Sequence, residues 1–320
     1  MSGEDDSSGW QLTESDPSVF TELLKTLGVP LIVDDLYSLD SETLASLEPL
    51  HALIFLFKWI PSSADTASAG QYDTDFPGFF AHQVVNNACA TLAVLNALGN
   101  IPSLPTGAQL AELNSFTAGM DPQTRGMVIT SADWLREAHN ALSPPSSVSL
   151  DGLGLPRKGE DAYHFVVYLP IMGAVYELDG LKEFPVRHGA YEENGEGWLK
   201  TAREVIENRI ATYPVGALEF SLLALRDDPL PALQTRLQEL QVSGNPTASA
   251  EVISLISREN EKRQRWAFEN SLRSHNHVGL IHALLVALAK GGKLSSAEAM
   301  AKTIMQARIK KVAASGEDLE

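Results

Sequence analysis

The stretch YHFVVYLPIMGAVYELDG, residues 163–180, holds two runs rich in β-branched and aromatic residues on either side of PIMG. Such a pattern is typical of a β-hairpin. A tight turn centred between Ile171 and Met172 pairs residues whose numbers sum to 343, which places His164 opposite Asp179. Directly opposed residues lie on one face of a sheet with their Cβ atoms about 4.5–5.5 Å apart. The hairpin therefore predicts either an imidazole held by a carboxylate or a purely structural salt link.

The chain has one cysteine, Cys89, in the stretch HQVVNNACAT (82–91), where irregular polar sequence gives way to apolar residues at helical spacing. Unpaired backbone N–H groups at the start of a helix stabilise a thiolate. Gln83 lies six residues earlier, and its amide together with the backbone N–H of Cys89 would give two donors for an oxyanion. A cysteine at an apolar helix start is more often inert packing. The prediction of a nucleophile depends on His164 and Asp179, which supply a base and its orienting group.

Together these four residues predict a thiol hydrolase. His164 takes the proton of Cys89 and later returns it to the leaving amine. Asp179 orients His164, and Gln83 binds the oxyanion. Acyl-enzyme chemistry of this type needs no metal and no organic cofactor.

The composition fits a globular protein in a reducing compartment. The 320 residues, 44% of them hydrophobic, can bury a sizeable core with room for an appendage. The N-terminal sequence lacks the basic and apolar regions of a secretory signal, and the longest nearly apolar run, ALIFLFKWI at 52–60, is too short to span a bilayer. A single cysteine allows no internal disulfide. We therefore expect no membrane partner and a cytoplasmic and nuclear location.

The net charge of −17 is unevenly spread, since residues 1–230 carry −20 and residues 231–320 carry +3. An acidic main part disfavours nucleic acid, whose phosphates need Lys and Arg, and favours a basic protein ligand. Acidity that serves only solubility is the alternative. The Arg-rich stretch at 258–273 predicts a solvated helix face or a protein-docking face rather than a nucleic-acid site.

Periodicity and end signals predict an alternation of helices and strands. Asp16-Pro17 before apolar residues at helical spacing, with Gly28 after them, indicates a capped helix. LHALIFLFKW at 50–59 predicts a central strand. Further helices are expected over 88–98, 107–118, 131–142 and 197–213, a strand over 217–225, and loops over 61–78 and 143–162.

The C-terminal part predicts a helical extension. VSGNPTASA after Gln241 indicates a linker, and three helical segments follow at about 250–274, 278–290 and 295–314. The apolar segment LIHALLVALA within them packs either on the main domain or on a partner helix.

Two local patterns in this extension have structural interpretations. Ser295-x-x-Glu298 is a capping box for the last helix. His275-x-His277 with His282 indicates a polar helix end rather than a metal site, because no cysteine and only scattered acids accompany these histidines.

The stretches FFAHQVVNNACAT, AYHFVVYLPIMGAVYELDGL, WQLTESDPSVFTELL and HALIFLFKW resemble, in motif and spacing, the ubiquitin C-terminal hydrolases, a family of papain-like cysteine deubiquitinases. The resemblance covers about residues 9–227. It implies a knotted α/β domain with a central antiparallel sheet sandwiched by helices. It also gives oxyanion, nucleophile, base and orienting roles to Gln83, Cys89, His164 and Asp179, in that order.

The same resemblance has implications for substrate and partner. The segment 143–162 takes the place of the family's crossover loop, which passes over the active site. Leu218 and Phe220 match positions that touch the apolar patch of ubiquitin, although ordinary strand packing is the alternative. FENSLRSHNHVGLIHALLVALAK is similar to the helical extension of the proteasome-associated members, which binds the adaptor domain of a proteasomal ubiquitin receptor.

We therefore expect a catalytic domain at 9–227, a helix and linker at 228–249, and a helical, partner-binding extension at 250–314. The expected activity is hydrolysis of the amide or isopeptide bond at the C-terminal glycine of ubiquitin, by an enzyme recruited to the proteasome. Two other functions stay open: a non-catalytic ubiquitin-binding scaffold, and a thiol amidase for another ubiquitin-like modifier.

Overall fold

The computed structural model describes residues 8–58, 70–143, 163–213, 220–275 and 277–315. The chain forms two compact units, whose boundary in this part of the sequence lies between Ser274 and His275. The first is a mixed α/β unit, and the described residues of the second form helices. The predicted α/β class with a helical extension is confirmed.

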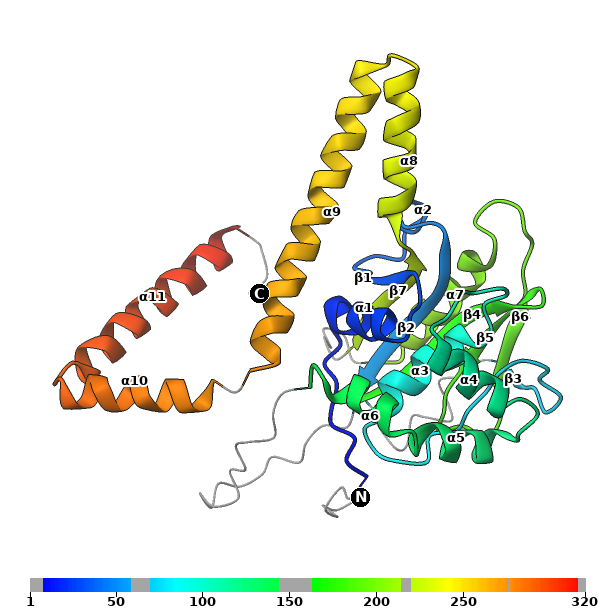
Figure 1. Cartoon of the computed structure of the whole chain (residues 1–320), viewed down its shortest axis with the longest axis horizontal. Coiled ribbons are helices and arrows are strands. Elements are labelled where there is room, and N and C mark those ends of the chain that lie inside the picture. The colour runs from blue at the N-terminus through cyan, green and yellow to red at the C-terminus, as the bar shows by residue number, and fades with distance from the viewer. Residues whose placement is uncertain (1–7, 59–69, 144–162, 214–219, 276, 316–320) are drawn as a thin grey trace. The chain divides into compact units, whose positions relative to one another are not determined.

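An antiparallel sheet of seven strands forms the centre of the first unit (Figure 1). The strands are β1 (Leu31–Asp35), β2 (Leu50–Lys58), β3 (Gln71–Tyr72), β4 (Tyr163–Ile171), β5 (Ala174–Leu178), β6 (Val186–Ala190) and β7 (Phe220–Asp227). Their order is β1-β7-β2-β4-β5-β6-β3, and every neighbouring pair is antiparallel. The predicted central strand, β2, lies inside the sheet between β7 and β4.

Helices cover both faces of this sheet. The described helices of the first unit are α1 (Pro17–Thr26), α2 (Ser41–Ser46), α3 (Cys89–Leu98), α4 (Ala108–Phe116), α5 (Pro122–Thr130), α6 (Asp133–Asn140), α7 (Trp198–Ile210), α8 (Pro229–Val242) and α9 (Pro246–Arg273), the last two of which pack against each other and cover neither face of the sheet. Buried residues of α1 and α3 to α6 form one core with one face of the sheet, and α2 and α7 form a second core with the other face. Because side chains alternate along a strand, Phe165 of β4 belongs to the first core and Val166 to the second.

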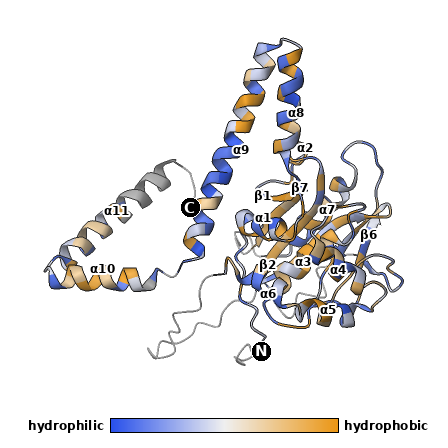
Figure 2. Ribbon diagram, viewed as in Figure 1, coloured by the Kyte–Doolittle hydropathy of each residue, from blue (hydrophilic) through white to orange (hydrophobic). Residues whose placement is uncertain are grey.

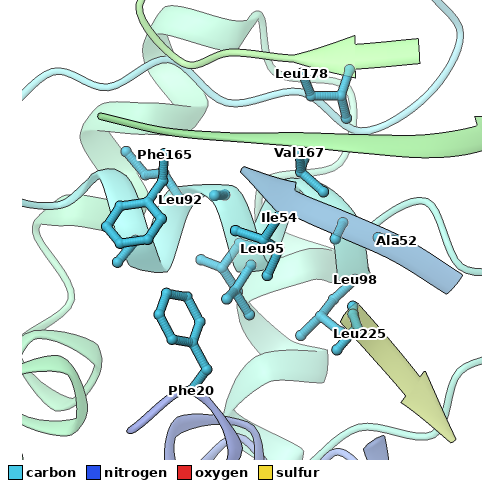
Figure 3. Packing of buried hydrophobic residues seen from close by; sticks show 14 of the residues in the cluster. Phe20, Ala52, Ile54, Leu92, Leu95, Leu98, Phe165, Val167, Leu178 and Leu225 are labelled. Carbon is cyan, nitrogen blue, oxygen red and sulfur yellow. The ribbon is translucent and has the colours of Figure 1, made fainter. Parts of the chain in front are cut away.

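Helix α3 is the central element of the first core. Nine of its ten residues are buried, as expected for a helix that is apolar on all sides. Figure 3 shows Leu92 and Leu95 of α3 pointing toward the strand residues, Ile54 among them. This packing holds the first residue of the helix, Cys89, in a fixed place beside the sheet.

The β4–β5 hairpin exists, but its predicted register is wrong by two residues. Ile171 pairs with Ala174, so paired residue numbers sum to 345 and the turn consists of Met172 and Gly173. Both turn residues have positive φ angles, of 47° and 78°, as the favoured two-residue hairpin turns require. The β-branched Ile171 adopts such angles at a high cost and glycine does not, which moves the turn toward Gly173.

The shifted register still leaves His164 and Asp179 on one face of the sheet. Side chains repeat with a period of two, so a shift by two residues changes the partner and keeps the face. Asp179 follows the last residue of β5 and does not pair directly with His164 in the ladder.

The sequence pattern does not predict five elements: α2, α5, β1, β3 and β6. Of these, β3 lies within the stretch 61–78, which the composition predicts to be a loop. Residues 144–162 of the expected crossover loop lie outside the described residues, and so does Leu218.

The linker after Gln241 is shorter than its composition predicts. Helix α8 ends at Val242, and α9 begins at Pro246 after the cap residue Asn245. The side chain of Asn245 accepts a hydrogen bond from the backbone N–H of Ala248 at 3.2 Å, which is the usual way to start a helix.

Helix α9 packs on the rest of the first unit through ion pairs. Lys262 Nζ lies 2.7 Å from Asp34 Oδ1, and Arg273 Nη2 lies 2.6 Å from Asp16 Oδ2. The hydrophilic colouring of most of α9 in Figure 2 agrees with this mode of contact. The Arg-rich stretch thus contacts the chain's own α/β domain. The first compact unit continues to Ser274, whereas the catalytic domain was expected to end at residue 227.

The second unit contains α10 (Val278–Lys290) and α11 (Leu294–Ser315). Ser295 is the second residue of α11 and not its cap, so the predicted capping box is wrong; Glu298 instead pairs with Lys302 at 2.7 Å, one turn later. Leu280, Ile281, Leu284 and Leu285 of α10 are 49–59% exposed. None of the described helices is long and apolar enough to cross a membrane.

Candidate active site

Cys89 is the first residue of α3 and is half-buried, with a free thiol. The chain enters the helix through Asn87, whose φ angle is +64° and whose side-chain amide donates to the carbonyl of Trp10 at 3.0 Å. Backbone N–H groups in the first turn of a helix have no partner within the helix. The predicted helix start at the cysteine is confirmed, and it places a thiol where the helix favours negative charge.

His164 and Asp179 contact each other through a short hydrogen bond. Nε2 of the imidazole lies 2.6 Å from Asp179 Oδ1, and the two side chains are only 5% and 7% exposed. The same carboxylate oxygen accepts the backbone N–H of Leu181 at 2.9 Å. The carboxylate is therefore held by the turn that follows β5, and it fixes the orientation of the imidazole.

The electrostatic environment keeps His164 protonated. Burial lowers the pKa of this imidazole, but the charge and hydrogen bond of Asp179, together with interactions with Cys89, raise it to about 9. Since Nε2 faces Asp179, the hydrogen bond with Cys89 uses Nδ1. The structure thus brings the three side chains together, and a charged imidazolium beside a thiol stabilises the thiolate.

Gln83 adjoins this group through the same turn. Its backbone N–H donates to the carbonyl of Gly180 at 2.8 Å, one residue after Asp179. Among the described residues nothing donates to its buried side-chain Oε1. A half-turn of the amide about its Cγ–Cδ bond presents an N–H in that place, as an oxyanion donor must. The contact with Gly180 therefore places the backbone of Gln83 beside the turn that carries Asp179.

Beside the site lies a buried ion cluster around Glu177, which the sequence pattern did not predict. Its carboxylate is 1% exposed and lies 2.9 Å from Lys182 Nζ, 3.1 Å from Arg209 Nη1 and 3.1 Å from His188 Nε2. Burial raises the pKa of Glu177, but the hydrogen bond with His188 and the charges of Arg209 and Lys182 hold it well below its usual value. The Lys182 pair joins β5 to the end of the turn that carries Asp179. Strand alternation could have revealed Glu177, which is two residues from Asp179 and on the same face.

Of the two residues predicted to touch ubiquitin, Phe220 lies among the described residues. It stands in one row with His164 across three strands. Phe57 of β2 pairs with Phe220 on one side and with His164 on the other. Phe220 is half-buried and lines a surface cavity of about 400 Å³ together with Leu36 and Ile210. Phe220, an apolar side chain on an open cavity, can serve either sheet packing or substrate contact.

The described residues contain no group of three or more His, Cys, Asp or Glu side chains that could hold a metal ion. The rings of His275 and His277 lie with their centroids 6.2 Å apart.

Comparison with known proteins gives a consistent result. Residues 10–211 match the family described as ubiquitin carboxyl-terminal hydrolase, family 1, and residues 249–294 match the family described as ubiquitin carboxyl-terminal hydrolases. Ubiquitin carboxyl-terminal hydrolase ubh-4 of Caenorhabditis elegans is 37% identical over 296 residues, covering 90% of this chain and 90% of its own. The isozyme L5 of Dictyostelium discoideum is 32% identical over 326 residues, covering 89% of this chain and 93% of its own.

A solved structure is similar over most of the chain. UCH37 of Trichinella spiralis, bound to ubiquitin vinyl methyl ester, has a TM-score of 0.65 and 32% sequence identity. The match covers 81% of this chain and 99% of that one. By its sequence, its antiparallel sheet between helices and its C-terminal helices, this chain belongs to the ubiquitin carboxyl-terminal hydrolase family.

Proposed function

We propose that Cys89, His164, Asp179 and Gln83 carry out the deubiquitinase reaction of this ubiquitin C-terminal hydrolase. The bond to be cleaved is the amide or isopeptide bond after the C-terminal glycine of ubiquitin. The observation that supports the proposal most strongly is the contact of His164 with both Asp179 and Cys89 at the start of α3.

Acylation begins with the thiolate of Cys89, whose proton resides on His164. The sulfur attacks the carbonyl carbon of the glycine, and the carbonyl oxygen becomes an oxyanion between the Gln83 amide and the backbone N–H of Cys89. The imidazolium then donates its proton to the leaving amine, the carbon–nitrogen bond breaks, and a thioester remains on Cys89.

Deacylation uses the same groups in the opposite direction. Neutral His164 takes a proton from water, the resulting hydroxide attacks the thioester, and Gln83 again holds the oxyanion. Cys89 leaves as a thiolate and ubiquitin departs with a free carboxyl group. The charge of Asp179 stabilises the imidazolium whenever it forms.

The substrate is proposed from the chemistry of the surface and from the solved relative that holds ubiquitin vinyl methyl ester. Residues 1–230 carry a net charge of −20, which attracts a basic protein face. Phe220 and Leu218 are proposed to touch the apolar patch of ubiquitin. The cavity of about 400 Å³ beside Phe220 supports this assignment for that residue.

The extension is proposed to recruit the enzyme to the proteasome, in the cytoplasm and the nucleus. The exposed leucines and isoleucine of α10 form an apolar surface of the kind that binds a partner helix in a groove. The proposed partner is the adaptor domain of a proteasomal ubiquitin receptor.

Turnover of a fluorogenic amide at the C-terminus of ubiquitin tests the proposed chemistry. His164→Ala should abolish turnover. A matched control exists, since His51 also pairs with an aspartate, Asp227 at 2.7 Å, but on the surface. His51→Ala should keep wild-type turnover. Wild-type turnover by His164→Ala, or cleavage of another ubiquitin-like modifier in preference to ubiquitin, would contradict the proposal.

A further inference from the structure

Residues 79–83 form an arm that carries Gln83 to the site. The arm contains no helix and no strand, yet a backbone group of each of its five residues is hydrogen-bonded. Irregular segments normally satisfy their backbone with water at the surface. An arm held at every residue by protein groups is therefore a constrained feature.

Two asparagines hold the arm from the side of α3. Asn96, which is 1% exposed, accepts the N–H of Ala81 at 2.8 Å and donates to its carbonyl at 3.2 Å. Asn100, just beyond the end of α3, accepts the N–H of Phe79 at 2.9 Å and donates to its carbonyl at 2.7 Å. Each side-chain amide thus gives the arm one donor and one acceptor, as the backbone of a neighbouring β-strand would.

Helix α5 holds the arm from the other side. Arg125 donates to the carbonyl of Phe80 at 2.6 Å, and the N–H of His82 donates to the carbonyl of Pro122 at 3.0 Å. A Cβ atom added to Gly126 would lie 2.1 Å from the carbonyl oxygen of His82. The absence of a side chain at position 126 therefore allows α5 to approach the arm closely.

Asn96 and Cys89 belong to one helix, seven residues apart, which is about two turns and hence the same side. A single rigid element therefore holds the nucleophile directly and the arm through Asn96. We infer that Asn96 is a positioning residue of the oxyanion hole: its paired hydrogen bonds with Ala81 set the place of Gln83 relative to Cys89. The inference rests on the proposed role of Gln83.

A purely structural role for Asn96 has different consequences. An amide that only satisfies two buried backbone groups would affect stability, and any loss of activity would be the same whether or not Gln83 is present. A positioning residue acts through Gln83, so its effect on catalysis disappears when the Gln83 amide is removed. Such non-additivity is the signature of residues that act as a unit.

The experiment measures kcat and KM for a fluorogenic ubiquitin C-terminal amide with four full-length variants: Asn96→Leu, Gln83→Ala, the double variant and Leu98→Ala. Leu replaces Asn with a similar shape and no hydrogen bonds. Gln83→Ala should lower kcat by about 10²- to 10³-fold, the usual loss for one oxyanion donor. Asn96→Leu should lower kcat by about tenfold to a hundredfold, with KM within about twofold, because small misplacement of a catalytic group is costly.

The double variant decides between the two roles. We expect its kcat to equal that of Gln83→Ala within about twofold. Leu98, a buried residue of the same helix that packs in the first core, is the control, and its change to Ala should lower the melting temperature while kcat stays near wild type. If Asn96→Leu does not fold, Asn100→Ala with and without Gln83→Ala provides the same comparison at Phe79.

Three outcomes would overturn the inference: an unchanged kcat in Asn96→Leu, an equal loss in both backgrounds, or no loss in Gln83→Ala. Failure of the proposed function itself gives a different result, in which Cys89→Ala, included as a fifth variant, retains turnover. The two failures are therefore distinguishable in one set of proteins.

Discussion

Replacing Asp179 with Asn tests how the site keeps its imidazole charged. The difference between the pKa of about 9 for His164 and its ordinary value of 6.5 corresponds to about 3 kcal/mol in favour of the imidazolium. Asn has nearly the same shape and no charge. Burial, which lowers this pKa, then acts against little more than Cys89, so we expect the pKa of His164 to fall to about 6.5 or below.

The assay is kcat/KM for a fluorogenic ubiquitin C-terminal amide between pH 6 and pH 10. In the wild type the activity should fall as the imidazolium loses its proton near pH 9. In Asp179→Asn this fall should occur near pH 6.5 or below. At pH 8 the protonated fraction of His164 would be about 30-fold smaller, which sets the minimum loss of rate. Ubiquitin binding should persist, because the side chain of Asp179 is buried.

The same shift affects stability. The folded-state pKa of His164 is raised, so its contribution to the free energy of unfolding is complete below about pH 6.5 and disappears as the pH rises through about 9. Between about pH 6.5 and about pH 9 the free energy of unfolding of the wild type should fall by up to about 3 kcal/mol. That of Asp179→Asn should not show this fall. Asp227→Asn, at the exposed pair with His51, is the matched control and should change neither profile. An alkaline limb that stays near pH 9 in Asp179→Asn would refute this reasoning.

Three further predictions concern the Glu177 cluster, Phe220 and the helical extension. Lys182→Met should destabilise the fold by less than about 3 kcal/mol in urea titrations, since Glu177 keeps Arg209 and His188 as partners, and it should lower kcat about tenfold. Lys182→Arg should retain wild-type stability and kcat, and equal behaviour of the two variants would exclude a role for the ion pair. Phe220→Ala should raise KM for a ubiquitin substrate about tenfold, and an unchanged KM would leave Phe220 as ordinary sheet packing. Leu284→Asp should weaken binding to a proteasomal adaptor domain at least about tenfold in titration calorimetry, with basal hydrolysis unchanged. Met300 is also exposed, on α11, and Met300→Asp should bind normally if α10 is the docking surface; the reverse pattern would move that surface to α11.

The chemistry of the site could be predicted from the sequence because it depends on residue type and parity. His164 and Asp179 share a face in the predicted register and in the observed one, because the two registers differ from each other by two residues and side chains repeat every two residues. Cys89 begins α3 because the apolar run that defines the helix begins there. For this reason a predicted register that is wrong by two residues still places His164 and Asp179 on one face of the sheet.

The supports of the site could not be predicted, because they depend on packing between distant elements. Helix α5 begins with Asp121-Pro122, the same signal as Asp16-Pro17 in α1, but Gly126 and the β-branched residues after it interrupt its helical pattern. The hydrogen bonds of an asparagine in α3 with the arm that carries Gln83 have no local signature. Neither does the docking of α9, since an Arg-rich helix gives no indication of which surface it meets.

The most direct test of the account is labelling with ubiquitin that carries an electrophile at its C-terminus, followed by peptide mass spectrometry. We predict one adduct per chain, on Cys89, with labelling lost in Cys89→Ala and strongly slowed in His164→Ala. A label on any other residue, or an undiminished rate in either variant, would contradict the claim that this thiol and this imidazole form the reactive pair.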